Sequence, residues 1–524
     1  MRATQQALLR IFSFLKNKPA VQIGGVLLLG LLIRLIWVAY TRYTAEDAFI
    51  TFKFAQRLAQ GHGFVYNIGQ PIYGTTTPLF ALLMAGWFWT GWGNITLAAH
   101  AVDLLSALAS LIILYLILRR MDVAHPAQLI LLGILAISSK MYSIEMQGME
   151  TPVVILLMMA SWYAMVTDRP YWAGFFAGWL LWTRIDLVFW PLALILVEAL
   201  FNYKVSLRIA LATAITYLPW VIFATLYFGS AVPFTIEAKW VAYVLPGLPL
   251  QTQLTTVINY LSPFSFDTIA TPEPLLLFAG CATLGIAIWQ VVRLGRDRSF
   301  LVLSVFACLE TVRLVLSGAT FFNRYLFPLL WVVLILFGLG LVSLWQVLSR
   351  KWQVPAWIPG CLLAAGLILI LWQAVDRSNL SRTEQTDLNE ASTQMVGIWL
   401  NRNSSPDASV LLEPLGYAGF YADRKMYDVI GLVTPQVVDL RLQGLDPQDF
   451  FRILRPDYVV QHCDDDLRLE NERADQGTRF VDLYHKVAGF NPLDFQPAAP
   501  AEISSDISVI PRNACYDIWQ RIGP

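Results

Sequence analysis

Apolar runs long enough to cross the hydrocarbon core of a bilayer recur through the first 376 residues of this 524-residue chain. They predict a polytopic α-helical membrane protein. We place eleven transmembrane helices, near residues 21–40, 96–118, 126–146, 151–167, 171–184, 187–203, 208–228, 274–293, 299–316, 326–347 and 355–376. The run Pro78–Trp92 is short for a crossing, and counting it as a twelfth span would reverse the orientation of everything after it.

Charged residues divide the chain into two parts. Residues 377–524 hold 36 of the 74 charged side chains, and residues 1–376 hold the other 38. The first part carries 23 Lys and Arg against 15 Asp and Glu, and the second carries 14 against 22, so +8 and −8 cancel. We therefore expect a membrane module over 1–376 and a soluble domain over 377–524. Nucleic-acid binding and wholesale disorder are disfavoured by this distribution.

The positive-inside rule orients the membrane module. With eleven spans and a cytoplasmic N-terminus, 14 of its 23 basic residues fall on the cytoplasmic side, whereas twelve spans would put ten of those 14 outside. Pro78–Trp92 is therefore expected to lie along the outer interface, as a helix over about 78–92 within an outer loop of residues 41–95. That loop, a second loop near 229–273 and the C-terminal domain then share the extracytoplasmic face of a cell membrane.

The C-terminal domain is expected to be α/β. A helix is predicted over 386–401, and short strands over 409–412, 458–461 and 479–484. Cys463 and Cys515 pair if the domain faces an oxidising compartment, and two free thiols are an equal alternative. The spacing of Cys and His residues indicates no zinc site.

Charged side chains near membrane depth are costly, so those at the outer face are functional candidates. Glu46 and Asp47 directly follow the first span. They are either solvated boundary carboxylates, or one of them is a general base for a hydroxyl. Arg184, Lys239 and Arg324 lie at outer ends of spans or in the second loop. Together they suit a phosphate, although each alone would also suit a snorkelling residue at the interface.

Further candidates lie in the loop Gly61–Leu79 and beside later spans. The loop is dense in Gly, Tyr, Thr and Pro, and can present hydroxyls and backbone N–H groups, although most such loops are only turns. His62 is either a proton-transfer group or incidental, and His100 with Asp103 is expected to form a buried polar pair. The substrate-binding candidates are His62, Tyr73, Thr75, Glu150, Asp186 and Tyr325.

Taken in order, these segments resemble the GT-C superfamily of membrane glycosyltransferases, which use polyprenyl-phosphate sugars as donors. The likeness is to bacterial members such as terminal arabinofuranosyltransferases and glycosyltransferase family 39. It rests on EDAFITFKFAQRL at 46–58, the loop Gly61–Leu79, Gly148–Thr151, Thr183–Asp186, Gly229–Pro233 with Lys239, Arg324–Leu326, Gly416-Tyr417 and Asp428–Val433. The sequence departs from the family pattern at Glu46, where Asp is usual, and at Ile68, where Pro is usual.

The resemblance implies transfer of a sugar to a hydroxyl of a glycan, lipid or protein acceptor of the cell envelope, with inversion at the anomeric carbon. Asp47 is then the general base, while the role of Glu46 stays open. Arg184, Lys239 or Arg324 would stabilise the departing lipid phosphate. No cofactor is required, and a divalent cation near the carboxylates is left open.

Three other classes of protein remain as alternatives. A transporter or flippase for a lipid-linked or small substrate would be expected to carry inverted repeats and charges near the bilayer midplane. Here the polar groups gather at one face instead. A lipid-linked polymerase or ligase would leave a similar one-sided polar surface, and a membrane scaffold with an outer binding domain is the third alternative.

Overall fold

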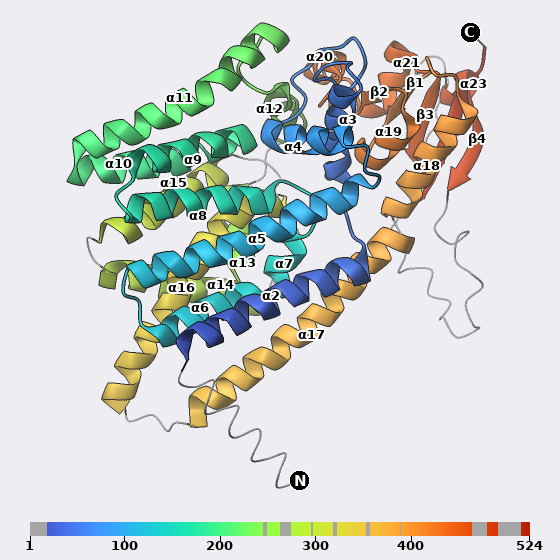
Figure 1. Ribbon diagram of the computed structural model, residues 1–524. Coiled ribbons are helices and arrows are strands. Elements are labelled where there is room, and N and C mark those ends of the chain that lie inside the picture. The colour runs from blue at the N-terminus through green and yellow to red at the C-terminus, as the bar shows by residue number, and fades with distance from the viewer. Residues whose placement is uncertain are drawn as a thin grey trace, which may run out of the picture.

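The computed structural model describes residues 18–523, except for 245–248, 263–273, 295–296, 318–321, 353–356, 388, 464–478 and 491–514. Long helices lie side by side in a bundle, and a small sheet domain lies beyond one end of it (Figure 1).

Within the described residues, six helices are long and apolar enough to cross a membrane. They are α2 (Pro19–Thr41), α5 (Ile95–Arg120), α11 (Tyr203–Phe228), α14 (Pro274–Leu294), α15 (Arg298–Leu316) and α16 (Asn323–Trp352). A seventh crossing arises if α6 (His125–Ile137) and α7 (Ser139–Glu145), which meet at 55°, form one broken span. The chain is therefore a multi-pass helical membrane protein, as expected, and the count of eleven spans stays a prediction.

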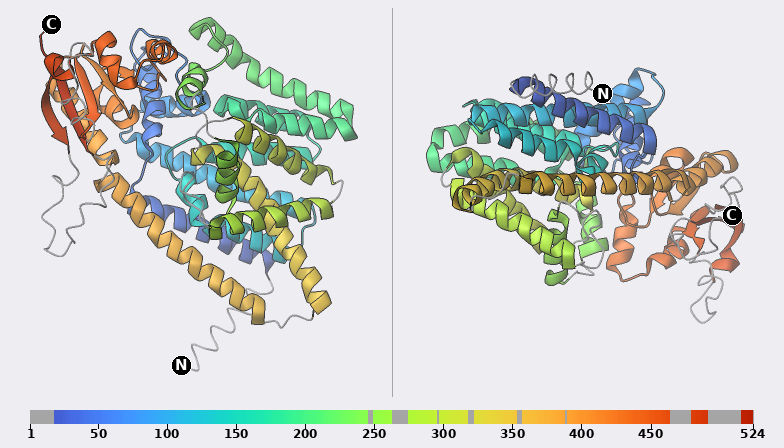
Figure 2. Two further views of the ribbon diagram at one scale, coloured as in Figure 1. Left: turned by 180° about the vertical axis from the view of Figure 1, so that it is seen from behind. Right: turned by 90° about the horizontal axis from the view of Figure 1, so that it is seen from below.

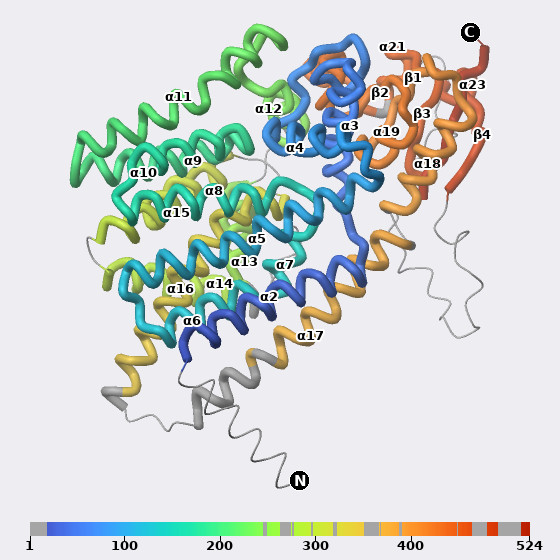
Figure 3. The backbone as a smooth tube through the Cα atoms, in the orientation of Figure 1, coloured from blue at the N-terminus to red at the C-terminus, as the bar shows by residue number. Residues whose placement is uncertain are grey.

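The other expected spans also fall on helices. These are α8 (Thr151–Val166), α9 (Pro170–Thr183), α10 (Phe189–Phe201) and α17 (Trp357–Asp387). α2 and α17 run beside each other in the same direction, and both end near the sheet domain (Figures 1 and 2). In the tube view, α17 leads directly into α18 (Asn389–Asn403) of that domain (Figure 3).

The break between α6 and α7 is held by Arg34 of α2. Its guanidinium donates to the backbone oxygens of Leu135 and Ala136, at 3.3 and 2.9 Å, and contacts the Glu145 carboxylate at 2.5 Å. Backbone groups freed inside a membrane need such partners. Glu145 is thereby committed to a structural ion pair.

Short helices separate the bundle from the sheet domain. The first outer loop forms α3 (Glu46–Ala59) and α4 (Pro78–Trp89), and α12 (Phe234–Lys239) lies beside them (Figure 1). With 12 residues, α4 is about 18 Å long, against about 30 Å of hydrocarbon. Its placement along the outer interface stays a prediction. α13 (Leu250–Leu261) follows within the bundle.

The C-terminal domain is α/β, and its described residues form a five-stranded sheet in the order β2-β1-β3-β5-β4. β1 pairs in parallel with β2 and β3, and β5 is antiparallel to β3 and β4. The strands are β1 (Ser409–Leu412), β2 (Lys425–Asp428), β3 (Tyr458–His462), β4 (Tyr484–Phe490) and β5 (Tyr516–Arg521). The accompanying helices are α18, α19 (Gly416–Ala422), α20 (Pro435–Leu442), α21 (Phe450–Leu454) and α23 (Phe480–Leu483).

The strand expected over 479–484 is wrong. Those residues form the short helix α23, and β4 begins only at Tyr484. The Asp482 carboxylate accepts the backbone N–H of Arg479 at 3.3 Å and so caps the helix, while the rings of Phe480 and Tyr484 stack 5.0 Å apart one turn along. In a strand, successive side chains point to opposite faces. Here a capped helical turn places two aromatic rings on the same side instead.

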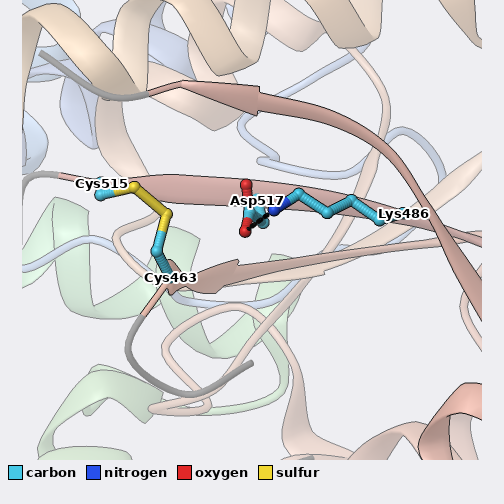
Figure 4. The surroundings of a disulfide bond; sticks show 4 residues. All are labelled: Cys463, Lys486, Cys515 and Asp517. Atoms are coloured by element: carbon cyan, nitrogen blue, oxygen red, sulfur yellow. Dashed lines mark hydrogen bonds and ion pairs between the residues drawn. A yellow bond between two sulfur atoms is a disulfide. The ribbon is translucent and has the colours of Figure 1, made fainter. Parts of the chain in front are cut away.

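Cys463 and Cys515 form a disulfide, which settles the alternative left open by the sequence. It joins the end of β3 to the start of β5, beside the ion pair of Lys486 and Asp517 that links β4 to β5 (Figure 4). The bond links two neighbouring strands through cysteines that are 52 residues apart in the sequence.

The first outer loop packs directly onto the C-terminal domain. The side chain of Asn67 exchanges two hydrogen bonds of 2.9 Å with the backbone of Met426 in β2, as a neighbouring strand would. The Tyr66 hydroxyl donates to the Leu415 backbone oxygen at 2.9 Å. Lys53 and Arg57 of α3 both pair with Asp423. The Gly-rich loop is therefore largely a docking element between the two modules.

Candidate active site

Three basic side chains surround the ring of Tyr325, near the start of α16. Lys239, the last residue of α12, donates from Nζ to the Tyr325 hydroxyl at 2.8 Å. The guanidinium carbons of Arg184 and Arg324 lie 4.6 and 5.2 Å from the ring centroid. The fold thus brings together the three cations that the sequence predicted to share a phosphate.

Carboxylates hold the two arginines in place. Arg184 follows α9 and contacts both carboxylate oxygens of Asp186, at 3.0 and 2.5 Å, while its third nitrogen donates to the backbone oxygen of Arg324 at 2.7 Å. Arg324 forms an ion pair with Asp47. Lys239, by contrast, donates to a hydroxyl, that of Tyr325.

Asp47 and Glu46 occupy the first turn of α3, where the helix dipole favours negative charge. Burial opposes ionisation of Asp47, but the charges of Arg324 and Lys239 outweigh it and hold the pKa of this carboxyl below its usual range. Burial, reinforced by the charge of Asp47, raises the pKa of Glu46. Adjacent carboxyl groups whose pKa values are shifted in opposite directions suit different chemical roles.

A small cavity of about 50 Å³ lies among these groups. Its charged lining consists of Asp47, Glu150, Arg184, Lys239 and Arg324, and hydroxyls of the loop complete it. Three cations around so small a space suit an anion, because charge-assisted hydrogen bonds to a phosphate would converge there.

A second cavity of about 400 Å³ lies between the membrane module and the C-terminal domain. Asp47, Lys239 and Arg324 line both this cavity and the small one, so Asp47 stands at their junction. The outer wall of the large cavity carries Glu390 of α18 and Glu413, which follows β1. Asp47 can therefore face a ligand in either cavity.

A third cavity of about 310 Å³ is mostly apolar. It adjoins the small one through Lys239 and Tyr325, which line both. Its apolar lining includes Ile185, Ile236, Trp240, Val244 and Leu314. An apolar groove that meets an anion site suits an amphiphile with a charged head.

The remaining predicted residues are placed differently. Thr75, Glu150 and Tyr325 line the small cavity, and Asp186 lines the apolar one. His62 is exposed and lines none of the three cavities. Tyr73 is buried against α11, where its hydroxyl accepts from Trp220 Nε1 at 2.5 Å and its ring stacks on Phe228 at 4.9 Å.

The expected polar pair shapes the turn before Glu150. His100 Nδ1 lies 4.0 Å from Asp103, whose carboxylate accepts the backbone N–H of Gly148 at 2.8 Å. Gly148 has a φ of +74°, a conformation that glycine adopts readily. The pair therefore supports the turn at Gly148. In the described ranges, no group of three or more His, Cys, Asp or Glu side chains could hold a metal ion.

Sequence reasoning missed the outer wall of the large cavity. Glu390 and Glu413 gave no signal, because they lie in a polar domain where carboxylates are common. Asp428 belonged to a recognised segment, and the structure shows its carboxylate accepting the backbone N–H groups of Leu432 and Val433, at 2.5 and 2.9 Å. It shapes the loop that closes one side of the cavity.

Comparison with solved structures identifies the fold. ArnT from Cupriavidus metallidurans bound to undecaprenyl phosphate aligns with a TM-score of 0.57 at 14% identity, over 85% of this chain and 94% of that one. The chain has the GT-C fold of membrane glycosyltransferases. Apo ArnT from the same organism also aligns at a TM-score of 0.57 and 14% identity, covering 90% of this chain and 95% of that chain.

The comparison with protein families finds one match in the sequence. Residues 379–512, within the C-terminal part, match a protein family described as a domain of unknown function (DUF8728). No curated protein matches the chain.

Proposed function

We propose that this protein is a membrane glycosyltransferase that moves a sugar from a polyprenyl-phosphate donor to a hydroxyl acceptor at the outer membrane face. The observation that carries the proposal is the convergence of Arg184, Lys239 and Arg324 on one small cavity, with the ionised carboxylate of Asp47 on its wall. The undecaprenyl phosphate bound to the ArnT structure of the same fold supports this donor class.

In this proposal each cavity holds one part of the two substrates: the donor phosphate, the donor isoprenoid chain or the acceptor. The donor phosphate occupies the small cavity, and its isoprenoid chain enters the apolar cavity beside Trp240 and Leu314. The acceptor occupies the large cavity, so that its hydroxyl approaches Asp47 from the side of the C-terminal domain. Asp47 would then lie between the two reacting molecules.

The reaction is a single displacement. Asp47 takes the proton of the acceptor hydroxyl as that oxygen bonds to the anomeric carbon. The bond from the anomeric carbon to the phosphate oxygen breaks, and its electron pair leaves with the polyprenyl phosphate, inverting the anomeric configuration. Lys239, Arg184 and Arg324 stabilise the charge that develops on the phosphate.

Arg324 couples donor binding to the strength of this base. It pairs with Asp47, and its positive charge contributes to the low pKa of that carboxyl. A donor phosphate offers Arg324 a second anion and adds negative charge near Asp47. Both changes raise the affinity of Asp47 for a proton, so the base strengthens when the donor is bound.

The disulfide supports the orientation. Such bonds persist in oxidising compartments, so Cys463–Cys515 favours a C-terminal domain outside the cytoplasm, with the N-terminus inside. The helix α3, whose first turn carries Asp47, lies at the same end of the bundle as that domain (Figure 1).

Donor binding tests the proposal without turnover. Full-length protein in nanodiscs is titrated with undecaprenyl phosphate, and Lys239→Gln and Arg324→Gln are each expected to weaken binding at least tenfold, the effect of losing one charged hydrogen bond. The control is Lys204→Gln, an exposed lysine at the start of α11. Equal affinity in all four proteins would contradict the phosphate site.

A further inference from the structure

Carboxyl groups of the C-terminal domain line the large cavity but not the small one. The volume of the large cavity, about 400 Å³, falls within the usual range of small-molecule sites, about 300 to 1,000 Å³. Glu390 and Glu413 of the C-terminal domain line it together with Glu46 and Asp47 of α3. Its ligand therefore meets carboxyl groups from both modules.

Glu390 supplies an observation that points to a ligand. Its side chain lines the cavity and the residue is only 4% exposed. The carboxyl group is within hydrogen-bonding reach of Glu384, but in the described part of the chain its Oε2 atom has no hydrogen-bond partner. Buried carboxyl oxygens without a partner are rare because desolvation is costly. A donor group of a bound molecule would satisfy this atom.

The protonation of the wall favours hydroxyl groups over ions. Burial and the neighbouring Glu384 carboxyl raise the pKa of Glu390, and burial together with Asp47 raises that of Glu46. Neutral carboxyls both donate and accept hydrogen bonds, as sugar hydroxyls do. They offer little attraction to a cation.

The cations of this cavity are already engaged. Lys239 and Arg324 also line the small cavity, where the donor phosphate would take them. Arg377, the third cation of the lining, has an interaction of its own within the protein. A second phosphate would lie close to the first and near the ionised carboxylate of Asp47, which is an unfavourable arrangement.

We propose that the large cavity is an acceptor site for uncharged, hydroxyl-rich saccharides, and that it excludes phosphorylated ones. The inference rests on the proposed function and names its acceptor class. Glu390 hydrogen-bonds an acceptor hydroxyl distant from the reacting one, while Tyr243 and Phe322, which also line the cavity and whose rings are 6.2 Å apart, contact the sugar face.

The test uses full-length protein in nanodiscs saturated with undecaprenyl phosphate. Neutral methyl glycosides are titrated beside the same glycosides carrying a 6-phosphate, and neutral forms are expected to bind at least tenfold more tightly. Glu390→Leu is expected to weaken neutral glycoside binding about 3- to 10-fold, the effect of one neutral hydrogen bond. Glu390→Gln keeps donor and acceptor atoms and is expected to restore it. The control is Asp439→Asn, an exposed carboxylate on α20.

Three outcomes overturn the inference alone. Phosphorylated glycosides that bind as tightly as neutral ones contradict the acceptor class, and unchanged affinity in Glu390→Leu contradicts the site. Protein that binds undecaprenyl phosphate but no glycoside also overturns this inference and leaves the proposed function standing. Loss of undecaprenyl phosphate binding in the wild type counts against both.

Discussion

Asp47 and Glu46 are neighbours in the chain, yet their surroundings drive their pKa values in opposite directions. Asp47 lies against Arg324 and is held ionised, whereas Glu46 turns to the C-terminal domain and accepts the backbone N–H of Gly416. One carboxyl is thus available for chemistry, and the other joins the two modules. The departure from the family pattern at Glu46 falls on the joining residue.

Gly416 leaves no room for a side chain at this joint. A Cβ atom there would overlap the backbone oxygen and the carboxyl group of Glu46. We expect Gly416→Ala to push α19 away from α3 and lower the thermal midpoint of the purified protein by several degrees. Gly86→Ala, on α4 where a Cβ meets no atom within 4 Å, is the control and is expected to leave the midpoint unchanged or slightly raised. Matching midpoints for the two variants would contradict the tight contact.

The sequence was enough to identify individual candidate residues, but it did not show which other residues each of them would contact. The cost of charge at membrane depth is local, so Arg184, Lys239 and Arg324 stood out without any knowledge of the fold. Their meeting at Tyr325 depends on three elements that lie far apart in the chain, with 140 residues between Arg184 and Arg324. Glu390 could not be found, because its unusual property is burial against a cavity.

Among the elements, α3 connects the site to the outer domain. Its first turn carries Asp47, and its middle carries Lys53 and Arg57, which pair with Asp423 at the end of α19. The side chain of Lys53 is fully buried. Burial, with a smaller contribution from Arg57, lowers the pKa of Lys53 to about 8 despite the attraction of Asp423.

The low pKa of Lys53 predicts how stability depends on pH. An unfolded lysine has a pKa of about 10.4, so between pH 8 and 10 the unfolded chain binds more protons and the folded state gains stability as pH rises. Below pH 8 the penalty is constant. We expect the thermal midpoint of the wild type to rise relative to that of Lys53→Met across this window, at about 1.4 kcal/mol for each unit of pKa difference. A constant difference between the two midpoints from pH 7 to 10 would contradict the shift.

Local patterns were sufficient for some elements and insufficient for others. β1 and β3 were predicted almost to the residue, because short apolar runs bounded by turns are typical of strands. The run at 126–146 was read as one span, and its bend at Ser138 depends on Arg34, a residue about 100 positions earlier. The helix α23 depends on a cap between Arg479 and Asp482 that a strand pattern conceals.

At the scale of the whole molecule, apolar periodicity and charge were enough to predict a membrane bundle with a C-terminal α/β domain. They were not enough to predict that residues 41–95 would pack into that domain. Asn67 pairs with β2 across 359 positions of sequence. The cavities arise from this packing, which no single segment determines.

The orientation can be tested with thiol reagents that do not cross membranes. In cells expressing a variant without Cys281, Cys308 and Cys361, we expect Cys463 and Cys515 to react only after treatment with an impermeant reductant, because they are paired on the outer face. A cysteine replacing Asp168, which is exposed between α8 and α9, is expected to react only after permeabilisation. The reverse pattern, or labelling of Cys463 without reduction, would contradict the orientation or the disulfide.

The central claim is that Asp47 drives sugar transfer from a polyprenyl phosphate. The most direct measurement offers the purified protein in lipid a panel of polyprenyl-phosphate monosaccharides with a mixture of acceptors, and follows release of polyprenyl phosphate. Donor-dependent release by the wild type is expected, with at least a 100-fold loss in a folded Asp47→Asn variant that still binds undecaprenyl phosphate, the effect of removing a general base. Release at the wild-type rate by Asp47→Asn, or none by a folded wild type across the panel, would contradict the account.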